Sequence, residues 1–205
     1  MLATMGSLAE SMIRQSVTML TNPSGVSREQ LLKDEDEVNR LHMAIDDSCL
    51  RMLVLRQPVA VDLRFLASTI KMNGELERIG DLSINLMKRA RKLEEQTSEP
   101  IPVDLNPLIS VAISMVNDAL DAFSRKDVAL ARKVLESEKA ADDQRHLLED
   151  KLAEMAESHG KSFMTYLQMT LVVYHLERIA DHATNIAEDV IYFLEGRDVR
   201  HRAGE

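Results

Sequence analysis

Apolar residues recur along this chain at the spacing of one face of an α-helix. Between residues 2 and 20, for instance, Leu8, Met12, Ile13 and Leu20 fall within one broad face of a helix. The same spacing continues almost to the C-terminus, and only short stretches with Pro, Gly or capping residues interrupt it. The pattern predicts an all-α fold with helices over residues 2–20, 27–56, 61–95, 106–124, 127–159 and 162–195.

Breakers and caps mark the ends of the first three helices. The turn at residues 21–25, which contains Pro and Gly, ends the first helix. Ser27 begins the second helix and, with Gln30 three residues later, forms the pattern of a capping box. Because Pro58 disfavours helical geometry at the residue before it, we expect the second helix to end at Arg56.

The second half of the chain restarts this pattern. We expect Asn106 to cap the fourth helix, with Pro107 in its first position, and Asp127 to cap the fifth. Gly160 and Gly196 stand where the fifth and sixth helices should stop. Each half therefore has one short helix followed by two long ones.

This order predicts two three-helix bundles side by side, related by a pseudo-twofold axis. The polar linker of residues 96–106 separates them, so we place the first bundle at residues 1–98 and the second at residues 104–197. Helices of about 35 residues would be roughly 50 Å long, which suits an elongated bundle better than a compact globule.

A repeated block of sequence supports the duplication. Residues 75–85 read ELERIGDLSIN and residues 175–185 read HLERIADHATN, so six of eleven positions are identical at an offset of 100 residues. The shared pairs are Leu76/Leu176, Glu77/Glu177, Arg78/Arg178, Ile79/Ile179, Asp81/Asp181 and Asn85/Asn185. A common helical periodicity would repeat the Leu and the Ile but not the charged and amide residues. The chain is therefore a tandem repeat.

The repeated polar residues share one side of each helix. Because they are spaced four residues apart, they form a stripe opposite the apolar face. We expect the stripe to point away from the core and to be accessible. The stripes consist of Glu77, Asp81 and Asn85 in the first copy and Glu177, Asp181 and Asn185 in the second.

The long helix before each stripe offers oxygen ligands at similar spacing. Glu35 and Asn39 in the first unit match Glu138 and Asp142 in the second at an offset of 103 residues. If neighbouring helices are antiparallel, each pair approaches the stripe of its own unit. Like charges gathered in this way raise one another's pKa, and a divalent or trivalent cation would relieve the repulsion. Oxygen ligands favour hard ions such as Mg, Ca, Mn or ferric iron. The candidate metal ligands are Glu35, Asn39, Glu77, Asp81, Glu138, Asp142, Glu177 and Asp181.

Simpler interpretations stand beside the metal site. An acidic pair on an exposed helix is usually a solvated face, and Arg78 and Arg178 could pair with nearby carboxylates. Recurrence inside a duplicated block favours a functional role. His175 and His182 flank the second stripe without counterparts in the first and are interpreted as incidental, although His182 could add a nitrogen ligand.

Composition narrows the function classes. Hydrophobic residues make up 45% of the 205 residues and aromatic residues only 3%, which predicts an aliphatic core. A net charge of −9 argues against a nucleic-acid binder. The single Cys49 is expected in the core, and no apolar run is long enough to span a membrane or to act as a signal peptide, which favours a soluble cytoplasmic protein.

The sequence contains no recognisable catalytic motif. It has no Glu-x-x-His pattern of di-iron proteins, no P-loop and no Cys-x-x-Cys pair. The residues thus give no positive support to catalysis. They leave open an oxygen-ligated metalloenzyme and a helical bundle that buffers metal.

The repeated blocks resemble the PhoU family of phosphate-transport regulators. Residues 57–64, which read QPVAVDLR, are also similar to the family's Gln-Pro-x-x-x-Asp-Leu-Arg turn before its third helix. The resemblance covers nearly the whole chain and implies the same fold of two three-helix bundles.

The resemblance also implies metal clusters at Glu/Asp-x-x-x-Asp motifs, with Fe or Zn in some members and Mg or Mn in others. Asn39 departs from this motif because it is an amide, which removes one charge from the first cluster. The matching pairs are Glu77 with Asp81, Glu138 with Asp142, and Glu177 with Asp181.

Finally, the resemblance implies a function and its partners. Members of the family act as negative regulators of phosphate uptake and of phosphate-starvation signalling. They are thought to connect the phosphate ABC transporter with the phosphate-sensing histidine kinase. For this chain we therefore expect a regulatory adaptor rather than an enzyme, with both proteins as partners and a homodimeric state. The net charge and the short apolar runs predict that it binds no nucleic acid and does not insert into the membrane.

Overall fold

The computed structural model describes residues 1–22, 25–97, 101–158 and 163–200, and these residues form six helices and no strand. The prediction of an all-α fold is confirmed. The helices are α1 (Leu2–Thr21), α2 (Arg28–Arg56), α3 (Ala60–Gln96), α4 (Asn106–Arg125), α5 (Val128–Ser158) and α6 (Phe163–Glu195).

Local signals place most helix ends where the structure has them. The Ser27 hydroxyl accepts a hydrogen bond from the backbone N–H of Gln30 at 3.2 Å, and Asp127 Oδ1 accepts one from the Leu130 N–H at 3.0 Å. Gly196, which follows α6, has a φ of 70° and so adopts the left-handed conformation expected of a stop. The capping box is only half formed, because the Gln30 side chain donates to Asp34 instead of returning to Ser27.

The expected cap of α4 is wrong by one residue. Leu105 occupies the N-cap position, and no side chain caps this helix. Asn106 instead donates its backbone and side-chain N–H groups to Asp104 Oδ1, at 3.0 and 2.8 Å. The Asn106 side chain is therefore bound to Asp104 and does not cap the helix. Gly160, predicted as the stop of α5, lies outside the described residues.

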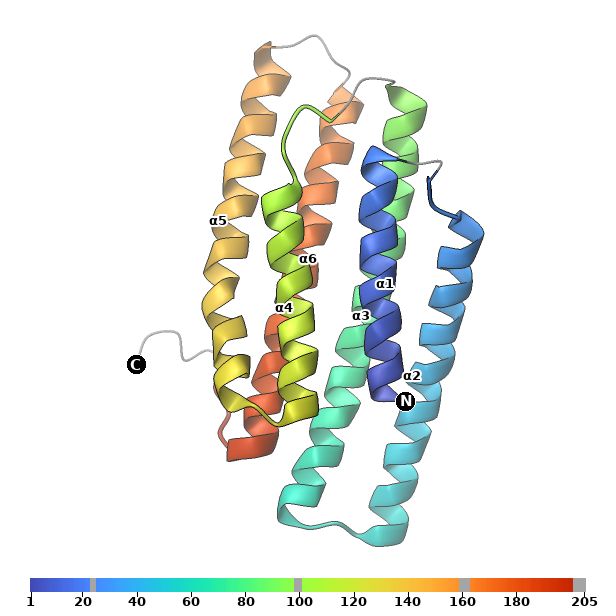
Figure 1. Cartoon of the computed structure of the whole chain (residues 1–205), viewed down its shortest axis with the longest axis vertical. Helices are drawn as coiled ribbons and strands as arrows, with labels where there is room; N and C mark the ends of the chain where they lie inside the picture. Colours follow the sequence, from blue (N-terminus) through green and yellow to red (C-terminus); the bar gives the residue numbers. More distant parts are fainter. Residues whose placement is uncertain (23–24, 98–100, 159–162, 201–205) are drawn as a thin grey trace.

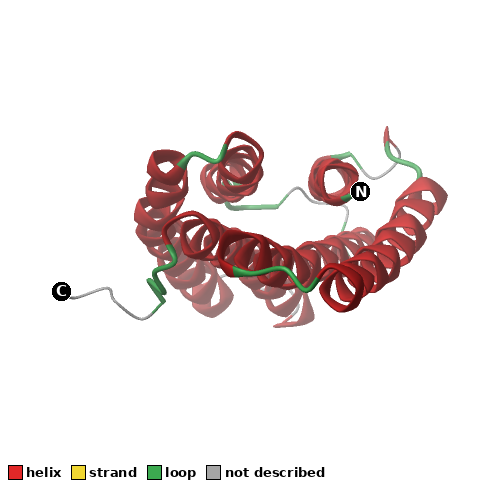
Figure 2. Cartoon of the chain, turned by 90° about the horizontal axis from the view of Figure 1, so that it is seen from below, coloured by secondary structure: helices red, strands yellow, loops and turns green. Residues whose placement is uncertain are grey.

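The helices form two units of three, side by side (Figure 1). The long helices α5, α6, α3 and α2 make one curved layer, and the short helices α1 and α4 lie on its concave side (Figure 2). The long helices of each unit are antiparallel neighbours, which is the condition for each acidic pair to approach the stripe of its own unit. Helices α3 and α6 pack against each other at the centre and join the two units.

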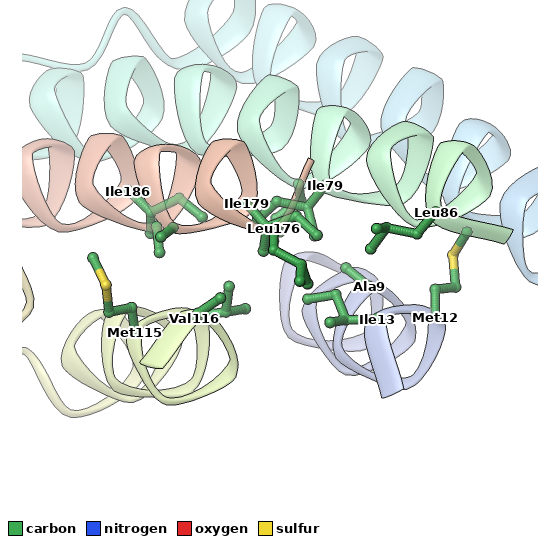
Figure 3. Close-up of a cluster of buried hydrophobic side chains, with 14 of the residues drawn as sticks. Ala9, Met12, Ile13, Ile79, Leu86, Met115, Val116, Leu176, Ile179 and Ile186 are labelled. Atoms are coloured by element: carbon green, nitrogen blue, oxygen red, sulfur yellow. The ribbon is translucent and has the colours of Figure 1, made fainter. Parts of the chain in front are cut away.

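The core is aliphatic and continuous across both units. At its centre Ile79 of α3 meets Leu176 and Ile179 of α6, and all three are fully buried (Figure 3). Cys49 is a buried free thiol, as expected. None of the helices in the described part of the chain combines the length and the apolarity needed to cross a membrane. The domain boundaries proposed above remain a prediction, since this core does not stop between the units.

Candidate functional site

The four predicted ligands of the second unit lie on the adjacent helices α5 and α6. The side chains of Glu177 and Asp181 are 14% and 30% exposed. Burial raises the pKa of Glu177, and the neighbouring charges of Asp181 and Asp142 raise it further. Burial also raises the pKa of Glu138, again with Asp181 and Asp142 as acidic neighbours. Glu138 of α5 and Glu177 of α6 are thus each affected by a carboxylate of the opposite helix.

Two arginines supply the counter-charge in this cluster. Arg145 Nε lies 3.6 Å from Glu177 Oε1, and another guanidinium nitrogen of Arg145 lies 2.9 Å from Glu149. Arg178 pairs with Asp181 at 3.1 Å, so the structural interpretation of this repeated arginine holds. Arg145 does not stand out among the charged residues of the sequence. Its place on the same side of α5 as Asp142, three residues earlier, is the sign that could have revealed it.

The acidic cluster of the first unit is more exposed to solvent than that of the second. Burial raises the pKa of Glu35, and the Asp81 charge on α3 adds to this shift, while Lys88 opposes it. Glu35 of α2 therefore lies beside Asp81, as predicted. Asp81 and Asn39 are exposed and Glu77 is half-buried. The first cluster is the more solvated of the two.

The expectation of an accessible stripe is only partly correct. It holds for Asp81, but Glu177 and Asp181 are half-buried. They lie beside Glu138 and Asp142 of α5, which packs along α6. Asn185 differs still more from the expected accessible position, because its side-chain amide donates to Glu75 Oε2 of α3 at 3.0 Å. The end of the second stripe therefore belongs to the contact between the two units.

The carboxylate clusters have the chemistry of a site for hard cations but not a closed ligand shell. Within the described residues, no three carboxylate, imidazole or thiol groups come close enough together to hold a metal ion. Glu177 Oε2 is nevertheless buried and makes no hydrogen bond to the described residues. A buried carboxylate oxygen without a partner is costly, and a bound cation would satisfy it. The donor set thus suits Mg, Mn or iron better than a soft metal.

Residues that differ between the two copies form a polar link across the molecule. His182 Nδ1 lies 2.6 Å from Glu75 Oε2, the same oxygen that accepts from Asn185. Burial acts to raise the pKa of Glu75, but these two hydrogen bonds outweigh it and hold the pKa below its ordinary value. The interpretation of His182 as incidental is therefore wrong, since it is the partner of Glu75.

A second link lies along the same contact. Lys71 Nζ of α3 binds Asp189 Oδ1 of α6 at 3.0 Å. His175 is 8% exposed, and neither ring nitrogen finds a hydrogen-bond partner among the described residues. Burial and the nearby Arg89 charge lower the pKa of His175 to about 4, so the ring is neutral at neutral pH.

Glu188 is an acidic residue that the sequence analysis overlooked. Burial, followed by the charge of Glu138, raises the pKa of Glu188 to about 7. It occupies the position of Lys88 in the first repeat, so the two units carry opposite charges at equivalent places. That exchange of sign is the pattern that could have drawn attention to it.

The fold and the carboxylate clusters together define a class: tandem three-helix-bundle proteins that carry acidic residues between the two long helices of each unit. The family model described as the PhoU domain matches residues 2–90 and again residues 105–190. The chain belongs to the PhoU family.

Individual relatives agree with this assignment. The chain is 36% identical over 201 residues to a phosphate-specific transport system accessory protein PhoU homolog of Pseudomonas putida, covering 98% of this chain and 78% of that protein. It is 30% identical over 202 residues to the phosphate-specific transport system accessory protein PhoU of Escherichia coli K12, covering 98% and 84%. The crystal structure of PhoU from Pseudomonas aeruginosa superposes with a TM-score of 0.90 at 35% identity, covering 96% and 94% of the two chains.

Proposed function

We propose that this protein is a cytoplasmic negative regulator of phosphate uptake and of phosphate-starvation signalling. It would act as a dimeric adaptor between the phosphate ABC transporter and its sensor histidine kinase, without catalysing a reaction. The observation that carries the proposal is the match of the PhoU domain to both halves of the chain. The printed names of the relatives describe accessory proteins of phosphate-specific transport, which supports the same role.

The geometry supports an adaptor in two ways. The long helices form a broad, continuous layer that offers a large surface to other proteins (Figure 2). Several titratable residues lie along helix contacts, where Glu177 and Asp181 pair with arginines and Glu75 is bound by a histidine across the units. Such residues hold helices in position and respond to bound cations, which suits regulation better than turnover.

We also propose that the clusters Glu35/Asn39/Glu77/Asp81 and Glu138/Asp142/Glu177/Asp181 bind hard metal ions. The mutual raising of carboxylate pKa values supports this proposal, as does the unpartnered Glu177 Oε2. A cation bound in the second cluster would replace the Arg145 guanidinium as the counter-charge of Glu177.

Deleting the gene for this protein in its own organism tests the regulatory proposal. In phosphate-rich medium, the deletion strain should keep phosphate uptake and a starvation-responsive reporter active, and the restored gene should silence both. A reporter that stays silent in the deletion strain would contradict the proposed function. Binding of the purified protein to the kinase's cytoplasmic region and to the transporter would then separate the two arms of the adaptor.

A further inference from the structure

The turn between α2 and α3 exposes an unusual concentration of apolar side chains. Among the described residues, sixteen large hydrophobic side chains are exposed, and eight of them lie within residues 50–65. We call residues 50–65 the α2–α3 tip. Val54, Leu55 and Val59 are the most exposed of its members, at 75%, 77% and 74%. Clusters of this kind mark surfaces that another molecule covers.

The tip projects from the body and has a firm base. It lies beyond the ends of the other helices, at the lowest point of Figure 1. At its base, Phe65 stacks on Phe123 of α4 with ring centroids 6.0 Å apart, and meets Phe193 of α6 at 5.3 Å. Arg64 Nε also donates to the Phe193 carbonyl at 3.3 Å. The first turns of α3 are thereby fixed against the second unit, and the rest of the tip stands free.

The backbone of the tip is held in an unfavourable shape. Gln57 and Ala60 have φ angles of 46° and 49°, in the left-handed region that residues with a Cβ avoid. Pro58, between them, restricts the turn further. Backbone strain of this kind is found where a particular shape is needed for binding. The turn thus presents its apolar side chains from a preformed, rigid loop, which lowers the entropy lost on association.

The charge of the tip differs from that of the whole molecule. The chain carries a net charge of −9, but residues 50–65 contain Arg51, Arg56 and Arg64 against the single acid Asp62. Arg51 pairs with Asp47 of the same helix at 2.8 Å and Arg64 is bound at the base of the tip, so Arg56 carries the basic charge beside the turn. A basic apolar knob complements an apolar pocket bordered by carboxylates. An anionic lipid surface is a poorer match, because it would repel the acidic body behind the tip.

We propose that the α2–α3 tip is a docking knob that enters an apolar, carboxylate-bordered pocket on a partner protein. The partner is a protein of the phosphate transport system, and this assignment of the partner rests on the function proposed above. Leu55 and Val59 fill the pocket, while Arg56 faces its acidic border.

Binding of the full-length protein to the phosphate transporter of the same organism, held in lipid nanodiscs, tests this proposal. The double variant Leu55→Ser/Val59→Ser should bind at least about tenfold more weakly than the parent. Arg56→Glu should also weaken binding, most strongly at low salt. Met43→Ser is the matched control, because Met43 is 67% exposed on α2 outside the tip, and it should bind as the parent does. All variants should keep the parent's thermal unfolding midpoint, since the altered side chains are exposed.

Each other result would overturn the proposal. Equal binding by the parent and the tip variants would show that the transporter uses another surface. Comparable binding to nanodiscs without transporter, lost in the tip variants, would make the tip a lipid anchor. A dimer that dissociates in the tip variants, seen by analytical ultracentrifugation, would make it a contact between copies. If the parent itself does not bind the transporter, the transporter arm of the proposed function fails too, whereas the first three results leave that function standing.

Discussion

At the scale of single residues, the positions at which the two copies differ are as informative as those they share. Glu75 stands where the second copy has His175, and His182 stands where the first has Leu82. The duplication has been broken at both places, and the non-repeated Glu75 and His182 now bind each other across α3 and α6. The polar link between the units thus uses residues that the two copies do not share.

Removing one side of this link should destabilise the protein. His182→Leu restores the residue found in the first copy and leaves the Glu75 carboxylate, which is half-buried, with only Asn185 as a hydrogen-bond partner. We expect a loss of about 1–3 kcal/mol in the free energy of unfolding. Urea unfolding of the parent, His182→Leu, Glu75→Gln and the double variant would measure the coupling. Strictly additive effects would show that the two side chains do not interact.

The raised pKa of Glu188, about 7, predicts a dependence of stability on pH. The folded protein holds this proton more tightly than the unfolded chain, whose Glu titrates near 4.5. The stabilisation is therefore complete below about pH 4.5 and is lost as the pH rises through 7. Glu188→Gln should remove this loss, so that at pH 8 its free energy of unfolding exceeds that of the parent by about 1 kcal/mol. The expected gain is modest because the side chain is half-exposed and solvent screens its charge. Thermal unfolding between pH 5 and 8 (roughly the window set by those pKa values) would show it, and parallel curves for parent and variant would contradict it.

A third prediction concerns Asp181, whose pKa is raised by burial and by Asp142 despite its pairing with Arg178. Asp181→Asn should weaken metal binding while stabilising the metal-free protein by a few tenths of a kcal/mol, because it removes a disfavoured charge. Asp81→Asn, at the exposed equivalent position, should change the metal-free stability less. A metal-free Asp181→Asn protein that is less stable than the parent would mean that the pair with Arg178 outweighs the repulsion.

At the scale of helices, the sequence predicts a feature well when residues close to it in the chain determine that feature. The caps at Ser27 and Asp127 and the stop at Gly196 follow from residues within one helical turn, and all three are found. The predicted cap of α4 is wrong because Asn106 lies one residue inside the helix, where its N–H groups donate to the neighbouring Asp104. The burial of Glu177 also escaped prediction, since a face that is polar by periodicity becomes half-buried when another helix packs beside it.

The α2–α3 turn gives a prediction at this scale. Ala60 has a φ of 49°, a conformation that glycine adopts without the steric penalty of a Cβ. Ala60→Gly should therefore stabilise the protein by about 0.5–1 kcal/mol. The control is Ala140→Gly on the exposed side of α5, where a right-handed helix makes glycine unfavourable by about 1 kcal/mol. The two substitutions should therefore change the free energy of unfolding, measured with urea, in opposite directions. A change in the same direction for both would show that the turn does not hold Ala60 in a left-handed conformation.

At the scale of the molecule, the two units share one arrangement of helices but differ in the charges they carry. Lys88 in the first unit corresponds to Glu188 in the second, and Asn39 corresponds to Asp142. The second unit is therefore richer in carboxylates, and it balances them with Arg145. The repeat in the sequence predicts the shared arrangement of helices, because Leu and Ile recur at core positions. It could not predict this balance, which depends on residues that α5 and α6 bring together from distant parts of the sequence.

This asymmetry makes the two proposed metal sites unequal. Glu77→Gln should disable the first site and leave the second, while Glu177→Gln should do the reverse, so each variant reports one site. Because a carboxylate replaces an amide at Asp142, the site left in Glu77→Gln should bind Mn²⁺ about tenfold more tightly. Free Mn²⁺ measured by electron paramagnetic resonance during a titration would give both affinities. Adding Asn39→Asp to Glu177→Gln should bring the first site close to the second, and removing the metal should lower the unfolding temperature most where binding is tightest. Equal affinities in the two single variants would mean that Arg145 cancels the advantage of the extra carboxylate, and the charge count would then not decide metal affinity in this protein.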